Sequence, residues 1–192
     1  MANINGIEIK AIKTFLGTEG YARQGNVYLD KKKMGFFSED GNGGCDWIEF
    51  ECDKEVKELF FRRVRAHYKK YPALDYMKIY DMTIEEYVKQ ENKLPVTTFE
   101  QESNDIIMEY FMEKLLNLRE FEQDYRNAVK KGYSELISIK YISLSGNALP
   151  LDEVYYTNGT HESFKKVENA AKEKSITVIV ESYTSPKDFI IM

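Results

Sequence analysis

Acidic side chains are concentrated in one segment of the chain's second half. Residues 97–124 hold eight acidic residues and only two cations, Lys114 and Arg119. On a helix turning about 100° per residue, six of these carboxylates share one arc that contains neither cation. We call these six residues the acidic stripe: Glu102, Asp105, Glu109, Glu113, Glu120 and Asp124. Like charges one turn apart cost a few tenths of a kcal/mol. A solvated helix face and a binding surface for a basic partner both fit the pattern.

The spacing of the acidic stripe favours a specific kind of partner. Successive i,i+4 carboxylates lie about 6 Å apart along a helix, close to the spacing of phosphates along a nucleic-acid strand. Such a row can therefore occupy a protein groove that binds DNA. A second acidic run has no intervening cation, and the 14 tyrosines are a residue type enriched at protein interfaces. This second run comprises Glu39, Asp40, Asp46, Glu49, Glu51 and Asp53.

Basic side chains gather in one predicted helix, which supports a different function. A helix after a set of short strands resembles a small nucleic-acid-binding module whose cations contact phosphates. Glu55 and Glu58 dilute this charge, so a solvated face also fits. The alternative nucleic-acid-binding residues are Arg62, Arg63, Arg65, Lys69 and Lys70.

No catalytic or metal-binding signature is complete. The loop from Asp40 to Glu51 partly matches calcium-loop spacing, but Gly44 brings no carboxylate and Cys45 replaces the glycine needed for the sharp turn. Cys45 and Cys52 are spaced too far apart for a typical zinc pair. His67 lies on an apolar helix face and is expected to be packed and hydrogen-bonded. We therefore expect no metal, no cofactor, no catalytic residue and no enzymatic activity.

The first half of the chain predicts an antiparallel β-meander followed by a helix. Alternation of Ile7, Ile9 and Ala11 with charged residues is typical of a half-buried strand. A hairpin is expected around Lys31–Lys33. Helical spacing of apolar residues runs from the N-cap Asp53 to Tyr71, where Pro72 ends it. The predicted strands are residues 7–11, 25–30, 34–38 and 46–50.

The second half predicts central helices and a C-terminal strand–helix–strand layer. Thr83 and Glu86 form a capping-box pattern, and Gly132 is placed to end a long helix. The fold class is α+β. The expected domains are 1–72, 73–98 with a linker at 93–98, and 99–192, with a single packed domain as the alternative. The predicted elements are helices 83–92, 103–131 and 160–173, and strands 136–144, 175–183 and 189–191.

Composition favours a soluble protein of the cytoplasm. The 192 residues are 43% hydrophobic and 31% charged, with a net charge of -5. The first fifteen residues lack the apolar run of a signal peptide. No stretch approaches the roughly 18 apolar residues of a membrane span. Two cysteines are too few for a disulfide scaffold.

The first 50 residues carry a family resemblance, in Gly17–Gly20, Gly25–Phe36 and Glu39–Gly44. These segments resemble small accessory proteins carried by phages and plasmids of Gram-positive gut bacteria. Some proteins of that group are anti-CRISPR inhibitors, which block the RNA-guided DNA nuclease of type II systems. Several are acidic and occupy the surface that reads DNA. The resemblance implies a non-enzymatic inhibitor that acts in the cytoplasm of a bacterial host cell and binds a nuclease or its guide-RNA complex. The alternative, which rests on the basic helix 62–70, is a DNA-binding accessory or regulatory protein.

Overall fold

The computed structural model describes residues 1–18, 20–42, 44–89, 93–142, 152–159, 161–174 and 177–192. The chain divides into two compact units. Unit 1 contains residues 1–72, 98–120 and 189–192, and unit 2 contains residues 73–97 and 121–188. Helices and strands both contribute substantially, so the α+β class is confirmed. The division differs from the expected domains because one long helix contributes residues to both units.

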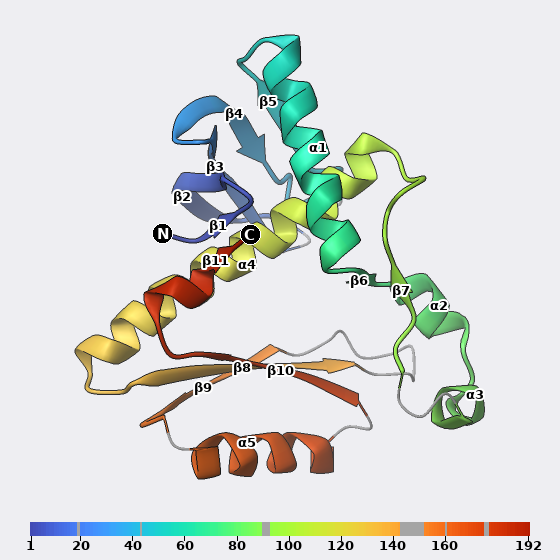
Figure 1. Cartoon of the computed structure of the whole chain (residues 1–192), viewed down its shortest axis with the longest axis vertical. Helices are drawn as coiled ribbons and strands as arrows, with labels where there is room; N and C mark the ends of the chain where they lie inside the picture. The colour runs from blue at the N-terminus through green and yellow to red at the C-terminus, as the bar shows by residue number, and fades with distance from the viewer. Residues whose placement is uncertain (19, 43, 90–92, 143–151, 160, 175–176) are drawn as a thin grey trace. The chain divides into compact units, whose positions relative to one another are not determined.

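Unit 1 is built on a six-stranded sheet (Figure 1). Its order is β11-β1-β2-β3-β4-β5, and every neighbouring pair is antiparallel except β1 with β11. The predicted meander is therefore present. Its first three strands, β2, β3 and β4, are longer than expected, whereas β5 is one residue shorter. The strands are β1 (Asn3–Ile4), β2 (Ile7–Leu16), β3 (Tyr21–Leu29), β4 (Lys32–Ser38), β5 (Trp47–Phe50) and β11 (Ile190–Ile191).

Two local features depart from the predicted strand pattern. Ile7 and Ile9 are buried as expected, but Ala11 is exposed, with a φ of 54°. A register shift between Lys10 and Lys13 marks a β-bulge there, so the alternation ends at residue 9. The residues 189–191 were expected in the C-terminal layer. Instead, β11 pairs with β1, through Asn3 with Ile190 and Ile4 with Ile191.

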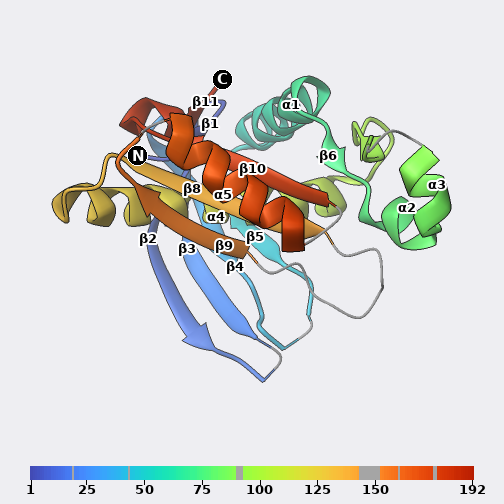
Figure 2. The ribbon, with the colours of Figure 1, turned by 90° about the horizontal axis from the view of Figure 1, so that it is seen from below.

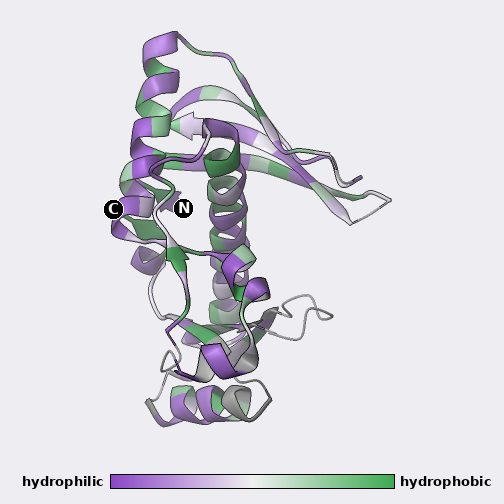
Figure 3. Cartoon of the chain, turned by 90° about the vertical axis from the view of Figure 1, so that its right-hand side faces the viewer, coloured by the Kyte–Doolittle hydropathy of each residue, from purple (hydrophilic) through white to green (hydrophobic). Residues whose placement is uncertain are grey.

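Two helices complete unit 1: α1 (Lys54–Lys70) and the part of α4 (Asn104–Lys130) up to residue 120. Asp53 occupies the N-cap position of α1, but its side chain makes no capping hydrogen bond. The Phe60 ring of α1 lies 5.8 Å from the Phe50 ring of β5 and 6.1 Å from the Phe111 ring of α4. Aromatic packing thus joins the sheet and both helices in one core. Hydrophilic and hydrophobic residues are interspersed along the helices, as amphipathic helices require (Figure 3).

Unit 2 contains a three-stranded antiparallel sheet of order β10-β8-β9. Helix α5 (His161–Lys174) packs on Ile137 and Ile139 through Phe164 and Val167. The strands are β8 (Glu135–Ile142), β9 (Asp152–Thr157) and β10 (Thr177–Tyr183). The strand–helix–strand prediction gave β8, α5 and β10 but omitted β9. The predicted ends at residues 90–92, 143–144, 160 and 175–176 lie outside the described residues.

The connecting segment of unit 2 is more ordered than a linker. β7 (Val96–Thr97) pairs with β6 (Ala73–Leu74), inside the region expected to be a linker. Helices α2 (Tyr76–Asp81) and α3 (Ile84–Lys89) lie between these two strands in the chain. The predicted capping box is present, because the Thr83 amide donates to Glu86 at 2.9 Å and the Glu86 amide donates to the Thr83 hydroxyl at 3.2 Å. A short 3₁₀ helix, η1 (Pro186–Phe189), precedes β11.

Candidate functional site

Most of the acidic stripe lies on α4 in unit 1. Asp105, Glu109, Glu113 and Glu120 belong to this part of the helix, and all four are exposed. Glu102 is exposed but precedes the first turn of α4, and so lies outside the helix on which it was predicted. Asp124 belongs to unit 2 and is half-buried, which raises the pKa of its carboxyl group. The continuous part of the stripe therefore runs from Asp105 to Glu120.

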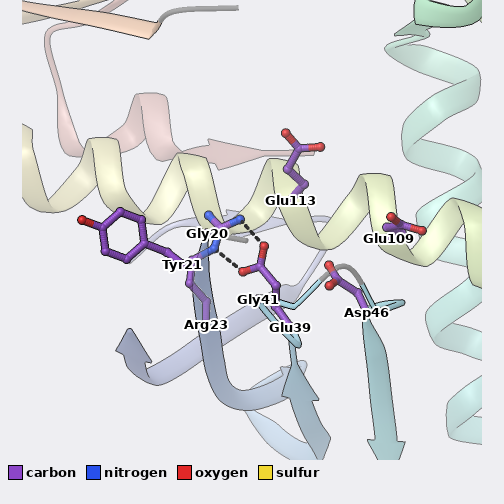
Figure 4. Close-up of a pocket in the computed structure, with 9 residues that line it drawn as sticks. Gly20, Tyr21, Arg23, Glu39, Gly41, Asp46, Glu109 and Glu113 are labelled. Carbon is purple, nitrogen blue, oxygen red and sulfur yellow. Dashed lines mark hydrogen bonds and ion pairs between the residues drawn. The ribbon is translucent and has the colours of Figure 1, made fainter. Parts of the chain in front are cut away.

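Glu109 and Glu113 line a cleft of about 430 Å³ together with two carboxylates from the sheet region. Glu39 follows β4 and Asp46 precedes β5, so the second acidic run of the sequence supplies them. Among the described lining residues, Arg23 of β3 is the only basic one. Figure 4 shows the Tyr21 side chain pointing away from these carboxylates. We call this arrangement the acidic cleft: Glu39, Asp46, Glu109 and Glu113 around Arg23.

Arg23 holds one carboxylate of the acidic cleft in a fixed position. Its Nε and Nη2 atoms donate to Glu39 at 2.6 and 3.2 Å, and its Nη1 atom donates to Asn117 at 3.3 Å. Glu120 lies 3.6 Å from the same Nη1 atom. Burial alone would lower the pKa of Arg23, but the hydrogen bond and attraction from Glu39 outweigh it and raise that pKa. One guanidinium thus attracts both Glu39 and Glu120, and the cleft keeps an excess of negative charge.

Within the acidic cleft, the carboxyl group of Asp46 has a raised pKa. Burial raises its pKa to about 6, and repulsion from Glu39 and Glu109 adds to the effect. Arg23 opposes the shift without cancelling it. Near neutral pH the Asp46 carboxylate is ionised but destabilised, so a cation entering the cleft would be favoured.

Contacts of Gly41 and Asn42 hold the loop that follows β4. Gly41 has a φ of 64°, and a Cβ atom there would lie 2.8 Å from the Cβ atom of Ala22. Asn42 accepts hydrogen bonds from the amide and hydroxyl groups of Thr18, at 3.0 and 2.7 Å. These contacts hold the loop after β4 against the β2–β3 turn. Asn42, inside the loop that partly matches calcium-loop spacing, thus has a structural role here.

The basic side chains of α1 are largely engaged within unit 1. Arg63 binds Asp30 at 2.7 and 2.5 Å and the Asn5 carbonyl at 2.8 Å. The Arg65 guanidinium binds three carbonyl oxygens that precede α4 and the Asn104 side chain. Lys70 donates to the Met192 carbonyl at 2.8 Å. Arg62 and Lys69 are exposed. The five cations are therefore not a uniform patch.

His67 departs from its prediction. It is buried, with 1% of its surface exposed, but neither ring nitrogen has a hydrogen-bond partner. Its ring packs against those of Tyr68 and Tyr71, each 5.2 Å away, and Phe111 at 5.9 Å. Burial, with a smaller contribution from Lys114, lowers the pKa of His67 to about 4. The histidine is therefore neutral at physiological pH and sits in an aromatic cluster.

Metal-binding geometry is not found in the part of the chain that the structure describes. There, no group of three or more His, Cys, Asp or Glu side chains is arranged to hold a metal ion. Cys45 is exposed and Cys52 is partly buried, and both are free thiols.

No family model, curated protein sequence or solved structure matches this chain. Among the helices described, none combines the length and apolar character of a membrane span.

Since no known protein matches, the chemistry of the site is inferred from its own residues. No pattern in the sequence near Arg23 indicated that it belongs to the site. Its partners Glu39 and Asn117 are distant in the sequence and are brought to it by the fold. Glu39 and Asp46 belonged to the second acidic run.

Proposed function

We propose that this protein is a non-enzymatic inhibitor that binds a basic surface of a DNA-cleaving nuclease. The observation that carries the proposal is the exposed row of carboxylates on α4, continued by the acidic cleft beside it. The N-terminal resemblance suggests a mobile-element protein acting in a bacterial host cell. It also suggests the partner, which is a type II RNA-guided nuclease or its guide-RNA complex.

The physical basis is competition for a groove that accepts DNA. Such grooves carry arginine and lysine side chains that neutralise phosphates. Helix α4 presents carboxylates on successive turns at Asp105, Glu109 and Glu113, and so offers these cations a similar spacing of negative charge. Electrostatic attraction would also speed the encounter between the acidic protein and its basic target.

Exposed aromatic side chains beside the acidic cleft support a protein partner. Tyr21 lines the cleft and is 68% exposed, and Trp47, next to Asp46, is 48% exposed. Tyrosine and tryptophan are enriched among the residues that dominate the energy of protein–protein binding. The proposed surface thus combines charge for attraction with apolar area for affinity.

The alternative, a DNA-binding accessory protein, has less support in the geometry. It requires the α1 cations to contact phosphates, but Arg63 and Arg65 bind groups of unit 1. Arg62 and Lys69 remain exposed and would have to carry that function.

A charge-reversal experiment tests the proposal. The double variant Glu109→Lys/Glu113→Lys inverts the charge where the acidic stripe meets the acidic cleft. Its matched control is Glu55→Lys/Glu58→Lys, which makes the same change in charge on an exposed face of α1. Lysine and glutamate have similar helix propensities, so both variants should fold.

Nuclease cleavage of DNA is titrated with the native protein and both variants. We expect the α4 variant to lose at least about tenfold in inhibitory potency, or 1.4 kcal/mol of binding. The control should retain native potency, and native inhibition should weaken as salt increases. Equal loss in both variants would indicate a net-charge effect only. Absence of inhibition across type II nucleases, with salt-sensitive DNA binding by the native protein, would favour the alternative function.

A further inference from the structure

In the part of the chain that the structure describes, the outer edge of β2 is unpaired over most of its length. β1 meets β2 only through the pair Ile4–Ile7, whereas β3 pairs with β2 as far as Leu16. Among the described residues, no other strand pairs with this edge. Figure 2 shows β2 and β3 extending side by side past the short β1. An open edge presents unpaired backbone amides and carbonyls that can pair with another strand.

Hydrogen bonding in the hairpin identifies the residues that present these groups. The Gly17 amide donates to the Gly20 carbonyl at 2.7 Å, so these two residues form a hydrogen-bonded pair next to the turn. Hydrogen-bonded and non-hydrogen-bonded pairs alternate in an antiparallel ladder. Leu16 and Thr14, opposite Tyr21 and Arg23, therefore direct their backbone amides and carbonyls to the open edge.

The bulge protects one part of this edge and leaves the next part regular. Bulges and lysines discourage edge-to-edge pairing, and the bulge lies between Lys10 and Lys13. From Lys13 to Leu16 the pairing with β3 has no further register shift. In this regular stretch Phe15 is 45% exposed and Leu16 is 77% exposed. Apolar side chains on an open, regular edge favour association.

We propose that two copies of this protein associate by antiparallel pairing of their β2 strands, centred on Thr14. In this register Leu16 lies opposite Ile12 of the partner subunit, which belongs to the bulge, and Phe15 lies opposite Lys13 of the partner subunit, inside the regular stretch. The first pair covers the most exposed apolar side chain of the edge. The second places a cation and its aliphatic stem beside an aromatic ring. The arrangement has two-fold symmetry and is closed, so it ends at a dimer.

Charge and strand geometry favour a second copy of this chain as the partner of the β2 edge, and they select the pairing register. No like charges face each other when Thr14 is the centre. A centre at Lys13 would place two ammonium groups in a close non-hydrogen-bonded pair, which is unfavourable. A centre at Phe15 would place the turn residues Gly17 and Thr18, which lie beyond the end of β2, opposite the partner's Lys13 and the partner's Ile12. The regular pairs span Lys13 to Phe15, roughly 10 Å of strand, with Ile12 and Leu16 at the margins, so the interface is small and we expect a dissociation constant above about 1 µM.

Sedimentation equilibrium over a concentration range up to about 500 µM tests the dimer, which is independent of the proposed function. Thr14→Pro removes an outward-facing amide, a change that edge strands tolerate. Thr14→Val keeps this amide and is the control. We expect dimer formation by the native protein and Thr14→Val, and at least about tenfold weaker association of Thr14→Pro. A native protein that stays monomeric, or a Thr14→Pro variant that dimerises like it, would overturn the proposal.

Disulfide cross-linking tests the register without relying on proline. Both native cysteines are first replaced, by Cys45→Ser and Cys52→Ser. Two Thr14→Cys side chains would then face each other, with Cα atoms about 5.5 Å apart, inside the range that a disulfide can bridge. Two Leu16→Cys side chains would be separated by about 14 Å along the strand. We expect mild oxidation to cross-link the first variant and not the second. Equal cross-linking, or the reverse order, would contradict the register.

Discussion

The Arg23 guanidinium binds the Glu39 carboxylate through two hydrogen bonds, Nε to Oε2 at 2.6 Å and Nη2 to Oε1 at 3.2 Å. This ion pair joins β3 to the loop after β4, and both side chains are mostly buried, with 16% and 22% exposed. It neutralises one carboxylate while Asp46, Glu109 and Glu113 lie around the same cleft. The ion pair therefore fixes the shape of the acidic cleft and leaves its negative charge in place.

Loss of the Arg23 side chain should destabilise unit 1. Arg23→Ala leaves the Glu39 carboxylate partly buried without its bidentate donor, so we expect the free energy of unfolding to fall by about 2 kcal/mol. Arg23→Lys keeps a positive charge but cannot form both hydrogen bonds, and should lose about half as much. Urea denaturation measures both values. A loss under about 0.5 kcal/mol for Arg23→Ala would show that the pair is an ordinary surface ion pair.

Arg65 should matter for folding and Arg62 should not. The Arg65 Nη1 and Nη2 atoms donate to the carbonyl oxygens of Phe99 and Glu102, both at 2.9 Å. Arg65→Ala removes these charge-assisted bonds and should lower the free energy of unfolding by about 2 kcal/mol. Arg62→Ala, on the exposed side of the same helix, should change it by under about 0.5 kcal/mol. Similar values for the two variants, measured by urea denaturation, would contradict the structural role of Arg65.

The sequence predicted the elements that have strong local signals. The helix 53–71 and the long helix 103–131 have apolar residues at helical spacing, and α1 and α4 match them within one or two residues at each end. The capping box at Thr83 and Glu86 is also local, and it was found. In contrast, β9 and the pairing of β11 with β1 were missed. These features depend on strand pairing across the chain, for which a single sequence contains no direct signal.

The candidate site shows the same division. Helical periodicity placed Asp105, Glu109 and Glu113 on one face, and these residues are exposed along α4. Helical spacing says nothing about the end of the helix, so Glu102 was included although α4 begins at Asn104. The role of Arg23 depends on long-range contacts with Glu39 and Asn117. Such contacts follow from the tertiary fold and not from spacing along the chain.

His67 should make the protein sensitive to acid. Its folded pKa, about 4, lies below the usual value of 6.5, so the unfolded chain binds a proton more readily. The stability that depends on neutral His67 is fully present above about pH 6.5 and is lost as the pH falls through 4. The resulting decrease in the free energy of unfolding is at most about 3 kcal/mol. His67→Phe keeps an aromatic ring in the cluster and removes the unpartnered nitrogens. We expect the variant to be more stable than the native protein, with the difference growing from pH 7.5 to pH 4.5.

Urea denaturation at several pH values measures this difference. Subtracting the native free energy of unfolding from that of His67→Phe cancels the titration of groups common to both proteins. A difference that is constant with pH would contradict a protonation effect at His67. A less stable variant at every pH would mean that the ring nitrogens are stabilised in the native protein.

Asp46 should have the opposite pH dependence, because its folded pKa is raised. The carboxyl pKa of about 6 lies above its usual 3.8, so the folded chain holds this proton more firmly than the unfolded chain does. The associated stability is complete below about pH 3.8 and is lost as the pH rises through 6. Because Asp46 is partly exposed, solvent screening reduces the effect to about 1 kcal/mol. Asp46→Asn should therefore be more stable than the native protein at pH 7.5 and equal to it near pH 4.

Carboxyl-carbon NMR titration locates the same proton directly, and comparison of variants assigns its cause. Asp46 should titrate near pH 6 in the native protein. Glu109→Gln removes one repelling carboxylate and should lower that midpoint by a few tenths of a unit, whereas Arg23→Lys should leave the direction of the native shift unchanged. Glu58→Gln, on α1, is the control and should not move it. A native midpoint near 4 would mean that the acidic cleft is open enough for water to screen its charges, and that Asp46 is not destabilised there.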